Sequence, residues 1–306
     1  MSQHSDQAPG AGRSSSAEEP WTIGGLLDWT ARFLAKKGVE FPRLDAEVLL
    51  AHVLGCKRID LYGLRHGEPA TDDVRQRYRD LIRRRLEGCP VAYLVGRKEF
   101  FSLELEVSPA VLIPRPDSET VVVECLALAR KMATPRVLDI GTGSGNLAVA
   151  VATQHKGARV TAVDQSAETL AVAARNAARH GVADRLRFLQ GDLFAPVPAG
   201  ERFDFVISNP PYIAREQLPH LPVGVRAYEP HLALDGGPGG FEVFDRLIAG
   251  AKDYLEPGGY LIVEIGAPQE EPARQRLAAH AGYELGPTVH DGSGHPRVLK
   301  ARWRPR

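Results

Sequence analysis

Cysteine is scarce in this chain of 306 residues, which contains only Cys56, Cys89 and Cys125. The three are scattered and odd in number, and no two of them have the spacing of metal ligands. This pattern argues against a disulfide framework or a zinc site and is typical of a reducing compartment. We therefore expect a cytoplasmic protein that binds no metal.

An excess of charge and a long hydrophobic run are also missing. Lys and Arg number 38 and Asp and Glu number 38, so the formal net charge is zero. Proteins that hold nucleic acid mainly through its phosphates usually have a clear basic excess, so nucleic acid is not expected as the direct substrate. No apolar run is long enough to cross a membrane, and no membrane partner is expected.

Residues 1–20 lack an apolar core. They are rich in Ser, Gly, Ala and Glu, and they have no apolar centre of the kind that a signal peptide needs. We expect this segment to be a disordered tail.

Residues 21–89 have the periodicity of a small helical domain. Apolar side chains recur at helical spacing in the three stretches 23–34, 44–54 and 74–86. The arginines at 83–85 lie on the polar side of the last stretch. They form either a solvated face or a patch that faces a partner.

Residues 90–115 change to an alternating pattern. Val91, Tyr93 and Val95 stand at alternate positions, and so do Leu103, Leu105 and Val107, with Gly96 between the two runs. This pattern predicts a β-hairpin that links the helical domain to the rest of the chain.

The run Ile-Pro-Arg-Pro-Asp-Ser-Glu occupies residues 113–119. Its two prolines fix the backbone, and Asp117 can cap the helix that the following apolar residues indicate. Arg115 and Glu119 either line the wall of a site or belong to a rigid linker, and the spacing does not choose between the two.

Residues 116–306 alternate between strand and helix patterns. Strands are expected at 137–140, 159–163, 186–189, 203–208 and 260–265, with weaker ones near Tyr283 and Val298. Helices are expected at 147–151, 170–180, 241–255 and 274–281. Repeated strand–helix units predict an α/β domain with a parallel sheet covered on both faces.

A glycine-rich loop follows the first of these strands. It consists of Gly141, Thr142, Gly143, Ser144 and Gly145. Glycine lets the backbone turn tightly and lets a ligand approach the peptide groups. The spacing differs from that of a dinucleotide site, and no Gly-Lys-Ser/Thr follows, so the loop is not a phosphate-cradling P-loop.

Acidic residues end the next two strands. A carboxylate at Asp164 can accept hydrogen bonds from both hydroxyls of a ribose. Asp192 can accept from an exocyclic amine, and Leu193 and Phe194 offer apolar surface for a purine. Each acid alone is more often a cap or turn residue, but together with the glycine loop they suit a nucleoside without phosphate, such as S-adenosylmethionine.

The segment Asn209-Pro210-Pro211-Tyr212 follows the apolar strand at 203–208. Two prolines end a strand, so the segment stands at a carboxyl end, where open α/β sheets bind ligands. The Asn209 oxygen and the Pro210 carbonyl can accept the two hydrogens of a planar amine, while the Tyr212 ring lies against it. We expect Pro211 to contact the substrate and Asn209 to reach the cofactor as well. These residues suit a glutamine amide or the exocyclic amine of a nucleobase equally.

With these motifs the chain resembles the class I S-adenosylmethionine-dependent methyltransferases over its C-terminal two-thirds. The segments 113–119, 209–213 and 229–237 carry a narrower resemblance, to the HemK/PrmC family. The helical region and hairpin are also similar, so the resemblance covers nearly the whole chain after Trp21. It implies a seven-stranded, Rossmann-like sheet whose last strand is antiparallel, with a small N-terminal helical domain joined to it by the hairpin.

The resemblance also implies an activity. Enzymes of this family transfer a methyl group from S-adenosylmethionine to the side-chain amide of a glutamine, in the GGQ loop of class I peptide-chain release factors. It implies that Gly141 to Gly145 and Asp164 hold the cofactor, and that Asn209, Pro210 and Tyr212 hold the target glutamine. Some members carry Trp where this chain has Leu193, so adenine stacking there is expected to be weaker.

Alternatives to this function involve the same chemistry. A sister family methylates a glutamine of a ribosomal protein, but its sequence differs at 113–119. A methyltransferase for exocyclic amines of DNA or RNA usually adds a basic recognition domain or base-flipping loops. Here the helical domain is short and only mildly basic, which favours docking of a protein substrate. A nucleotide-binding scaffold without activity would not need Asn209.

Overall fold

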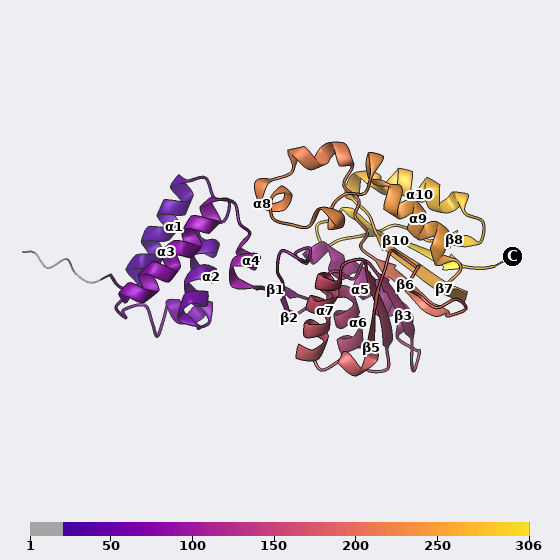
Figure 1. Ribbon diagram of the computed structural model, residues 1–306, viewed down its shortest axis with the longest axis horizontal. Helices are drawn as coiled ribbons and strands as arrows, with labels where there is room; N and C mark the ends of the chain where they lie inside the picture. Colours follow the sequence, from indigo (N-terminus) through magenta and orange to yellow (C-terminus); the bar gives the residue numbers. More distant parts are fainter. Residues whose placement is uncertain (1–20, 306) are drawn as a thin grey trace, which may run out of the picture. The chain divides into compact units, whose positions relative to one another are not determined.

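The structure is a computed structural model in which residues 21–305 are described. The expected disordered tail, 1–20, lies outside the described residues. The chain divides into two compact units, with the division between Leu86 and Glu87 (Figure 1).

The first unit is helical, as its periodicity predicts. Its elements are α1 (Ile23–Lys36), α2 (Pro42–Leu54), the 3₁₀ turn η1 (Arg58–Leu61) and α3 (Asp72–Leu86). The Thr22 hydroxyl caps α1 by accepting a hydrogen bond from the Gly25 amide at 3.1 Å. The core of this unit consists of the fully or nearly fully buried side chains of Ile23, Leu27, Leu34, Leu49, Leu50, Leu61, Tyr78 and Ile82.

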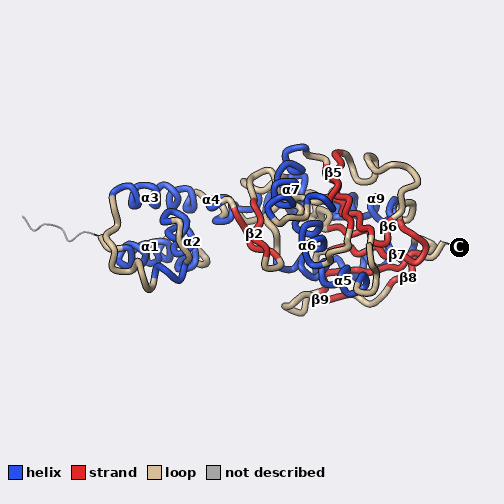
Figure 2. Tube along the Cα trace, turned by 90° about the horizontal axis from the view of Figure 1, so that it is seen from below, coloured by secondary structure: helices blue, strands red, loops and turns tan. Residues whose placement is uncertain are grey.

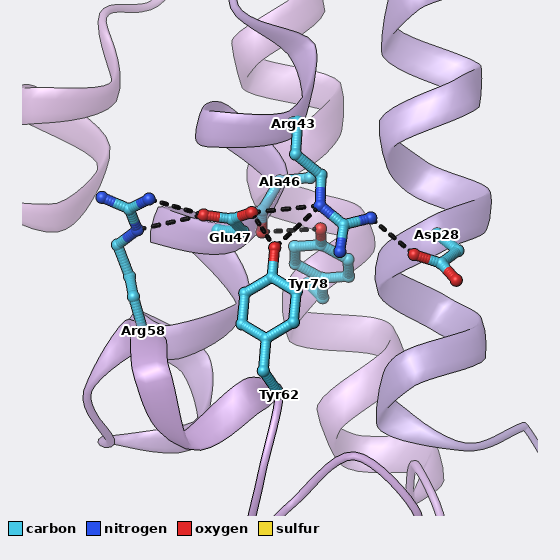
Figure 3. Close-up of polar contacts among 7 residues, drawn as sticks. All are labelled: Asp28, Arg43, Ala46, Glu47, Arg58, Tyr62 and Tyr78. Atoms are coloured by element: carbon cyan, nitrogen blue, oxygen red, sulfur yellow. Dashed lines mark hydrogen bonds and ion pairs between the residues drawn. The ribbon is translucent and has the colours of Figure 1, made fainter.

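A polar cluster around Glu47 ties these helices together (Figure 3). Glu47 is 5% exposed, and its carboxylate accepts from Arg43 Nε at 3.0 Å, from Arg58 Nη2 at 2.6 Å and from the Tyr62 hydroxyl. Arg43 also pairs with Asp28 of α1 at 2.5 Å. The cluster therefore connects α1, α2 and the segment around η1.

The second unit begins with a short helix, α4 (Val91–Val95), followed by the hairpin β1 (Arg97–Phe100) and β2 (Leu103–Glu106). The expectation that 91–95 is the first hairpin strand is wrong. Pro90 is the N-cap of α4, and Gly96 at φ 72° ends it in the left-handed region. A five-residue apolar run fits either element by periodicity, and these flanking residues decide for the helix.

The main sheet contains β3 (Arg136–Ile140), β4 (Arg159–Asp164), β5 (Leu186–Gln190), β6 (Phe203–Ser208), β7 (Leu255–Glu264), β8 (Tyr283–Leu285), β9 (Val289–His290) and β10 (Pro296–Trp303). Its order is β5-β4-β3-β6-β7-β10-β8, and the two-residue β9 pairs with β10 beside this path. Strands β3 to β7 are mutually parallel, whereas β10 is antiparallel to β7. The expected seven-stranded order with an antiparallel last strand is confirmed, and β9 is an addition to it.

Helices cover both faces of the sheet (Figures 1 and 2). One face packs against α5 (Glu119–Ala129), α6 (Asn146–Gln154) and α7 (Ala167–Arg179). The other packs against α9 (Glu242–Ala251) and α10 (Glu270–Ala279). Neighbouring strand residues alternate between the two cores, as Val137 and Leu138 do on β3.

Several element boundaries differ from the expectation. Helix α7 begins at Ala167 because Ser166 caps it by accepting from the Thr169 amide at 3.1 Å. Helix α9 ends at Ala251 and not at 255, since Leu255 already pairs with Phe203 as the first residue of β7. Helix α10 begins at Glu270, earlier than expected, and ends at Ala279.

The remaining connections contain short helical turns. These are η2 (Pro116–Ser118), η3 (Ala183–Arg185), η4 (Arg215–His220), α8 (Val223–Arg226), η5 (His231–Ala233), η6 (Pro238–Gly240) and η7 (Ala267–Gln269). Among residues 21–305, no helix combines the length and the apolar character that crossing a membrane requires. Because β3, β4, β5 and β6 are parallel, their carboxyl ends meet at one edge of the sheet, where the candidate site lies.

Candidate active site

A cavity of about 340 Å³ opens at the carboxyl ends of the parallel strands. Of the residues expected in the site, it is lined by Gly141, Gly143, Ser144, Asp164, Asp192, Leu193, Asn209, Pro210 and Pro211. The remaining three, Thr142, Gly145 and Tyr212, are not part of its wall. The sheet edge therefore brings together residues from four separate loops.

The glycine loop performs two different tasks. Gly141 and Gly143 have φ angles of 72° and 57°, and a Cβ at either would meet no atom within 4 Å. Their backbone thus needs glycine for its conformation, and the space beside it is free for a ligand. Gly145 instead packs against α7, where an added Cβ would lie 3.1 Å from the Ala173 Cβ.

Thr142 anchors the glycine loop to the end of β3. Its hydroxyl donates to Asp139 Oδ2 at 2.7 Å, and both residues are buried. Burial raises the pKa of Asp139 to about 7, and its Oδ1 has no hydrogen-bond partner among the described residues. Thr142 therefore shapes the loop through Asp139.

Asp164 is held by backbone amides. Its Oδ2 accepts from the Gly143 amide at 3.0 Å and its Oδ1 from the Ser166 amide at 3.2 Å. Burial raises its pKa, although these hydrogen bonds oppose the rise. Each oxygen keeps a second lone pair, so the carboxylate can still accept from two hydroxyl groups.

Asp192 is already engaged by side chains. It accepts from Gln165 Nε2 at 3.1 Å and from the Arg246 guanidinium of α9. The next residue, Leu193, is in the left-handed region at φ 47° and lines the cavity. Arg246 also lines the cavity, and no motif indicates it in the sequence.

Asn209 and Tyr212 are both fixed by neighbours from distant segments. Asn209 Nδ2 donates to Ser118 Oγ at 3.0 Å, and Ser118 is completely buried. Tyr212 lies beside Glu264 at the end of β7. Burial, with the nearby Glu264 charge, raises the pKa of Tyr212 to about 12.

Some residues of the run 113–119 line the cavity, and others only hold neighbouring segments in place. Arg115 lines the cavity and pairs with the buried Glu229 at 2.5 Å. Glu119 instead accepts from the Phe101 amide at 2.8 Å and so holds the hairpin turn. The expected capping role of Asp117 is wrong: Ser118 is the N-cap of α5, and the Asp117 carboxylate pairs with Arg297 at 3.1 Å.

The arrangement can hold a nucleoside and a planar amine side by side. Ser144 Oγ is buried in the cavity wall without a hydrogen-bond partner among residues 21–305. Together with the open glycine backbone and the free lone pairs of Asp164, it offers donors and acceptors to a ribosyl group. The donor set therefore fits S-adenosylmethionine.

Comparisons with known proteins agree with this geometry. Residues 25–96 match the family described as PrmC N-terminal domain, and residues 117–221 match the methyltransferase small domain. The release factor glutamine methyltransferase of Rhodopirellula baltica is 42% identical over 93% of this chain and 97% of its own length. That of Geobacter sulfurreducens is 43% identical over 93% of this chain and 98% of its own length.

A solved structure supports the fold alone. The hMettl16 catalytic domain, solved in complex with a 3′UTR hairpin, superposes with a TM-score of 0.54 at 16% identity. The match covers 74% of this chain and 82% of that one.

Proposed function

The chain belongs to the family of release factor glutamine methyltransferases, and from this premise we propose its reaction and its partners. The enzyme transfers a methyl group from S-adenosylmethionine to the side-chain amide nitrogen of a glutamine in class I peptide-chain release factors. The observation that carries the proposal is the convergence of Gly143, Asp164 and Asn209 on one cavity.

The cofactor would occupy the glycine-loop side of the cavity. Gly141, Gly143 and Ser144 would face it with backbone and hydroxyl groups, and Asp164 would accept from the ribose hydroxyls. Leu193 would supply apolar surface for the adenine, with Asp192 and Arg246 at the rim. When bound, S-adenosylmethionine supplies a methyl group activated by its sulfonium.

The chain's own task is to place the amide. An amide nitrogen is a weak nucleophile because its lone pair is delocalised into the carbonyl. The Asn209 side-chain oxygen and the Pro210 carbonyl would accept its two hydrogens, and the two prolines would keep both acceptors stiff. Holding the nitrogen in line with the methyl carbon is an orientation effect, which can supply roughly 7–11 kcal/mol of a barrier.

The helical unit provides a second role. We assign residues 21–89 to docking of the release factor, which is supported by the match of this region to the PrmC N-terminal domain. A release factor acts on ribosomes, so we place the enzyme in the cytoplasm.

The substrate class is tested by a parallel assay. Labelled methyl transfer from S-adenosylmethionine is measured with purified release factor, ribosomal protein, DNA and tRNA. We expect label on one glutamine of the release factor. Label on the ribosomal protein or on a nucleobase amine would replace the proposed substrate.

The role of Asn209 is tested in the same assay. Asn209→Ala removes the side-chain acceptor, and we expect turnover to fall by about 10²–10³-fold, as when one positioned transition-state partner is lost. The affinity for S-adenosylmethionine, measured by calorimetry, should change little. Near-normal turnover in this variant would contradict the assigned role.

A further inference from the structure

Glu264 is a buried acid behind the cavity wall that the proposed reaction does not use. It is the last residue of β7 and is 1% exposed. Because β6 and β7 are parallel and Ser208 pairs with Val263, Glu264 follows in register beside Asn209. Its Oε2 has no hydrogen-bond partner in the described part of the chain. Burying a carboxylate in this way costs folding free energy, so a functional role for Glu264 is expected.

Glu264 connects Asn209, which would hold the substrate amide, with Tyr212, which lies outside the cavity wall. The side chains of Ser118 and Tyr212 both lie beside its carboxylate and lower its pKa. Ser118 Oγ in turn accepts from Asn209 Nδ2 at 3.0 Å. Ser118 and Asn209 are 91 residues apart in the sequence, and only the folded sheet edge joins them.

The number of protons gives this chain of contacts a direction. An ionised carboxylate only accepts hydrogen bonds, and a serine hydroxyl has one proton to give. Beside an ionised Glu264, Ser118 would therefore donate to the carboxylate and turn a lone pair toward Asn209. Asn209 must then present its NH₂ group to Ser118, which leaves its carbonyl oxygen free for the cavity. The oxygen and nitrogen of an Asn amide are otherwise difficult to tell apart. Here the Glu264 carboxylate, on the other side of Ser118, determines which end faces Ser118.

We propose that Glu264 and Ser118 are positioning residues that orient Asn209 with its oxygen toward the substrate amide, and that Glu264 also fixes the Tyr212 ring. This inference rests on the proposed function, since it assigns Asn209 the role of acceptor for the glutamine amide. Neither residue has to touch the substrate, because Glu264 acts through Ser118 on Asn209.

The Glu264–Ser118–Asn209 relay depends on the ionisation of Glu264. Burial raises the pKa of Glu264 to about 7, partly offset by Ser118, Arg297 and Tyr212, while the Asp117 charge adds to the rise. Arg297, on β10, is itself paired with Asp291 and Asp117. A protonated Glu264 can donate to Ser118, which is then free to donate to the Asn209 oxygen and turn the amide round. Turnover should therefore fall as the pH falls through about 7.

The test compares kcat and KM in the full-length enzyme with a release factor as substrate. Glu264→Gln keeps the shape but can donate to Ser118, and we expect kcat to fall by roughly 10²-fold, as for a misplaced reacting group. The KM for S-adenosylmethionine should stay within about twofold, since only the acceptor side is disturbed. The acid limb of the kcat profile near pH 7 should disappear.

Ser118 supplies an independent test. Ser118→Ala should lower kcat, while Ser118→Thr retains the hydroxyl and should restore most of it. Combining Ser118→Ala with Glu264→Gln should cost no more than Glu264→Gln alone, because residues in one relay are not additive. If the kcat losses of the two single variants multiply in the double variant, the proposed relay is wrong.

The outcomes separate this inference from the proposed function. If the wild-type enzyme methylates no release factor, the proposed function fails. If it does, and Ser118→Ala and a folded Glu264→Gln retain its kcat and pH profile, only the positioning role fails. Should Glu264→Gln not fold, the Ser118→Ala and Ser118→Thr pair decides.

Discussion

Two buried glutamates, Glu47 of the first unit and Glu264 of the second, have opposite surroundings. Glu47 accepts four hydrogen bonds, three of them from Arg43 and Arg58. Burial alone would raise its pKa, but the bonds from Tyr62, Arg58 and Arg43 hold the pKa below its usual value. Glu264 instead lies beside the neutral hydroxyls of Ser118 and Tyr212, and burial raises its pKa to about 7.

The difference separates a structural acid from a functional one. A carboxylate paired with arginines stays ionised to a lower pH than usual, so it can hold helices together as in Figure 3. A carboxylate that faces mainly hydroxyl groups changes its charge near neutral pH, and its neighbours change their donors with it. Shifted pKa values of this kind gather at functional sites.

The largest expected effect is on the pH dependence of stability. Glu264 has a raised pKa in the folded state, so its contribution to stability is fully present below its unfolded pKa and is lost as the pH rises through about 7. Relative to Glu264→Gln, the wild type should lose about 3 kcal/mol of unfolding free energy between pH 4.5 and 8. Glu47, whose folded pKa is lowered, has the opposite sign and loses its contribution on acidification.

Denaturant unfolding can measure this change in the second unit alone. Trp303 is its one tryptophan, since the other two, Trp21 and Trp29, belong to the first unit. Replacing Trp21 and Trp29 by Phe therefore makes fluorescence report on the second unit. Equal slopes with pH for the wild type and Glu264→Gln would show that Glu264 does not carry the raised pKa. Activity and stability should thus change in opposite directions as Glu264 ionises.

The next effect concerns Glu47. Glu47→Gln removes the charge that Arg43 and Arg58 share, and we expect the first unit to lose about 2 kcal/mol. The loss is moderate because both arginines are half exposed and can be solvated again. The measurement is denaturant unfolding in a Trp303→Phe background. S-adenosylmethionine affinity should not change, and a loss of affinity would contradict a purely structural role.

Much of the sheet edge is predictable because local patterns determine it. Short apolar runs predict the parallel strands, and turn residues at their ends deliver Asp164 and Asn209 to one edge. The run 91–95 shows the limit of this reasoning. Its alternation fits a strand, but Pro90 and Gly96 enclose only five residues, and a short helix forms there.

The supports of the site are not predictable from local pattern. Glu264 looks like the polar end of the apolar strand 260–265, and only folding buries it beside Ser118. Arg246 reaches Asp192 across 54 residues of sequence, so no spacing rule finds it. Side chains that touch a ligand stand in motifs, whereas those that orient them depend on tertiary packing.

The smallest expected effect tests whether the Glu47 cluster stabilises mainly through its buried part. Asp28 pairs with Arg43 at 2.5 Å, but the two side chains are 52% and 42% exposed. Exposed ion pairs contribute about 0.2–1 kcal/mol, so Asp28→Asn should cost less than 1 kcal/mol, well below the cost of Glu47→Gln. Unfolding of the first unit at low and high salt measures both. Because salt screens exposed charges more than buried ones, the Asp28 contribution should vanish in high salt while that of Glu47 persists. An equal or larger loss for Asp28→Asn would mean that the helices are held from the surface, and that burial does not distinguish the carboxylates of this unit.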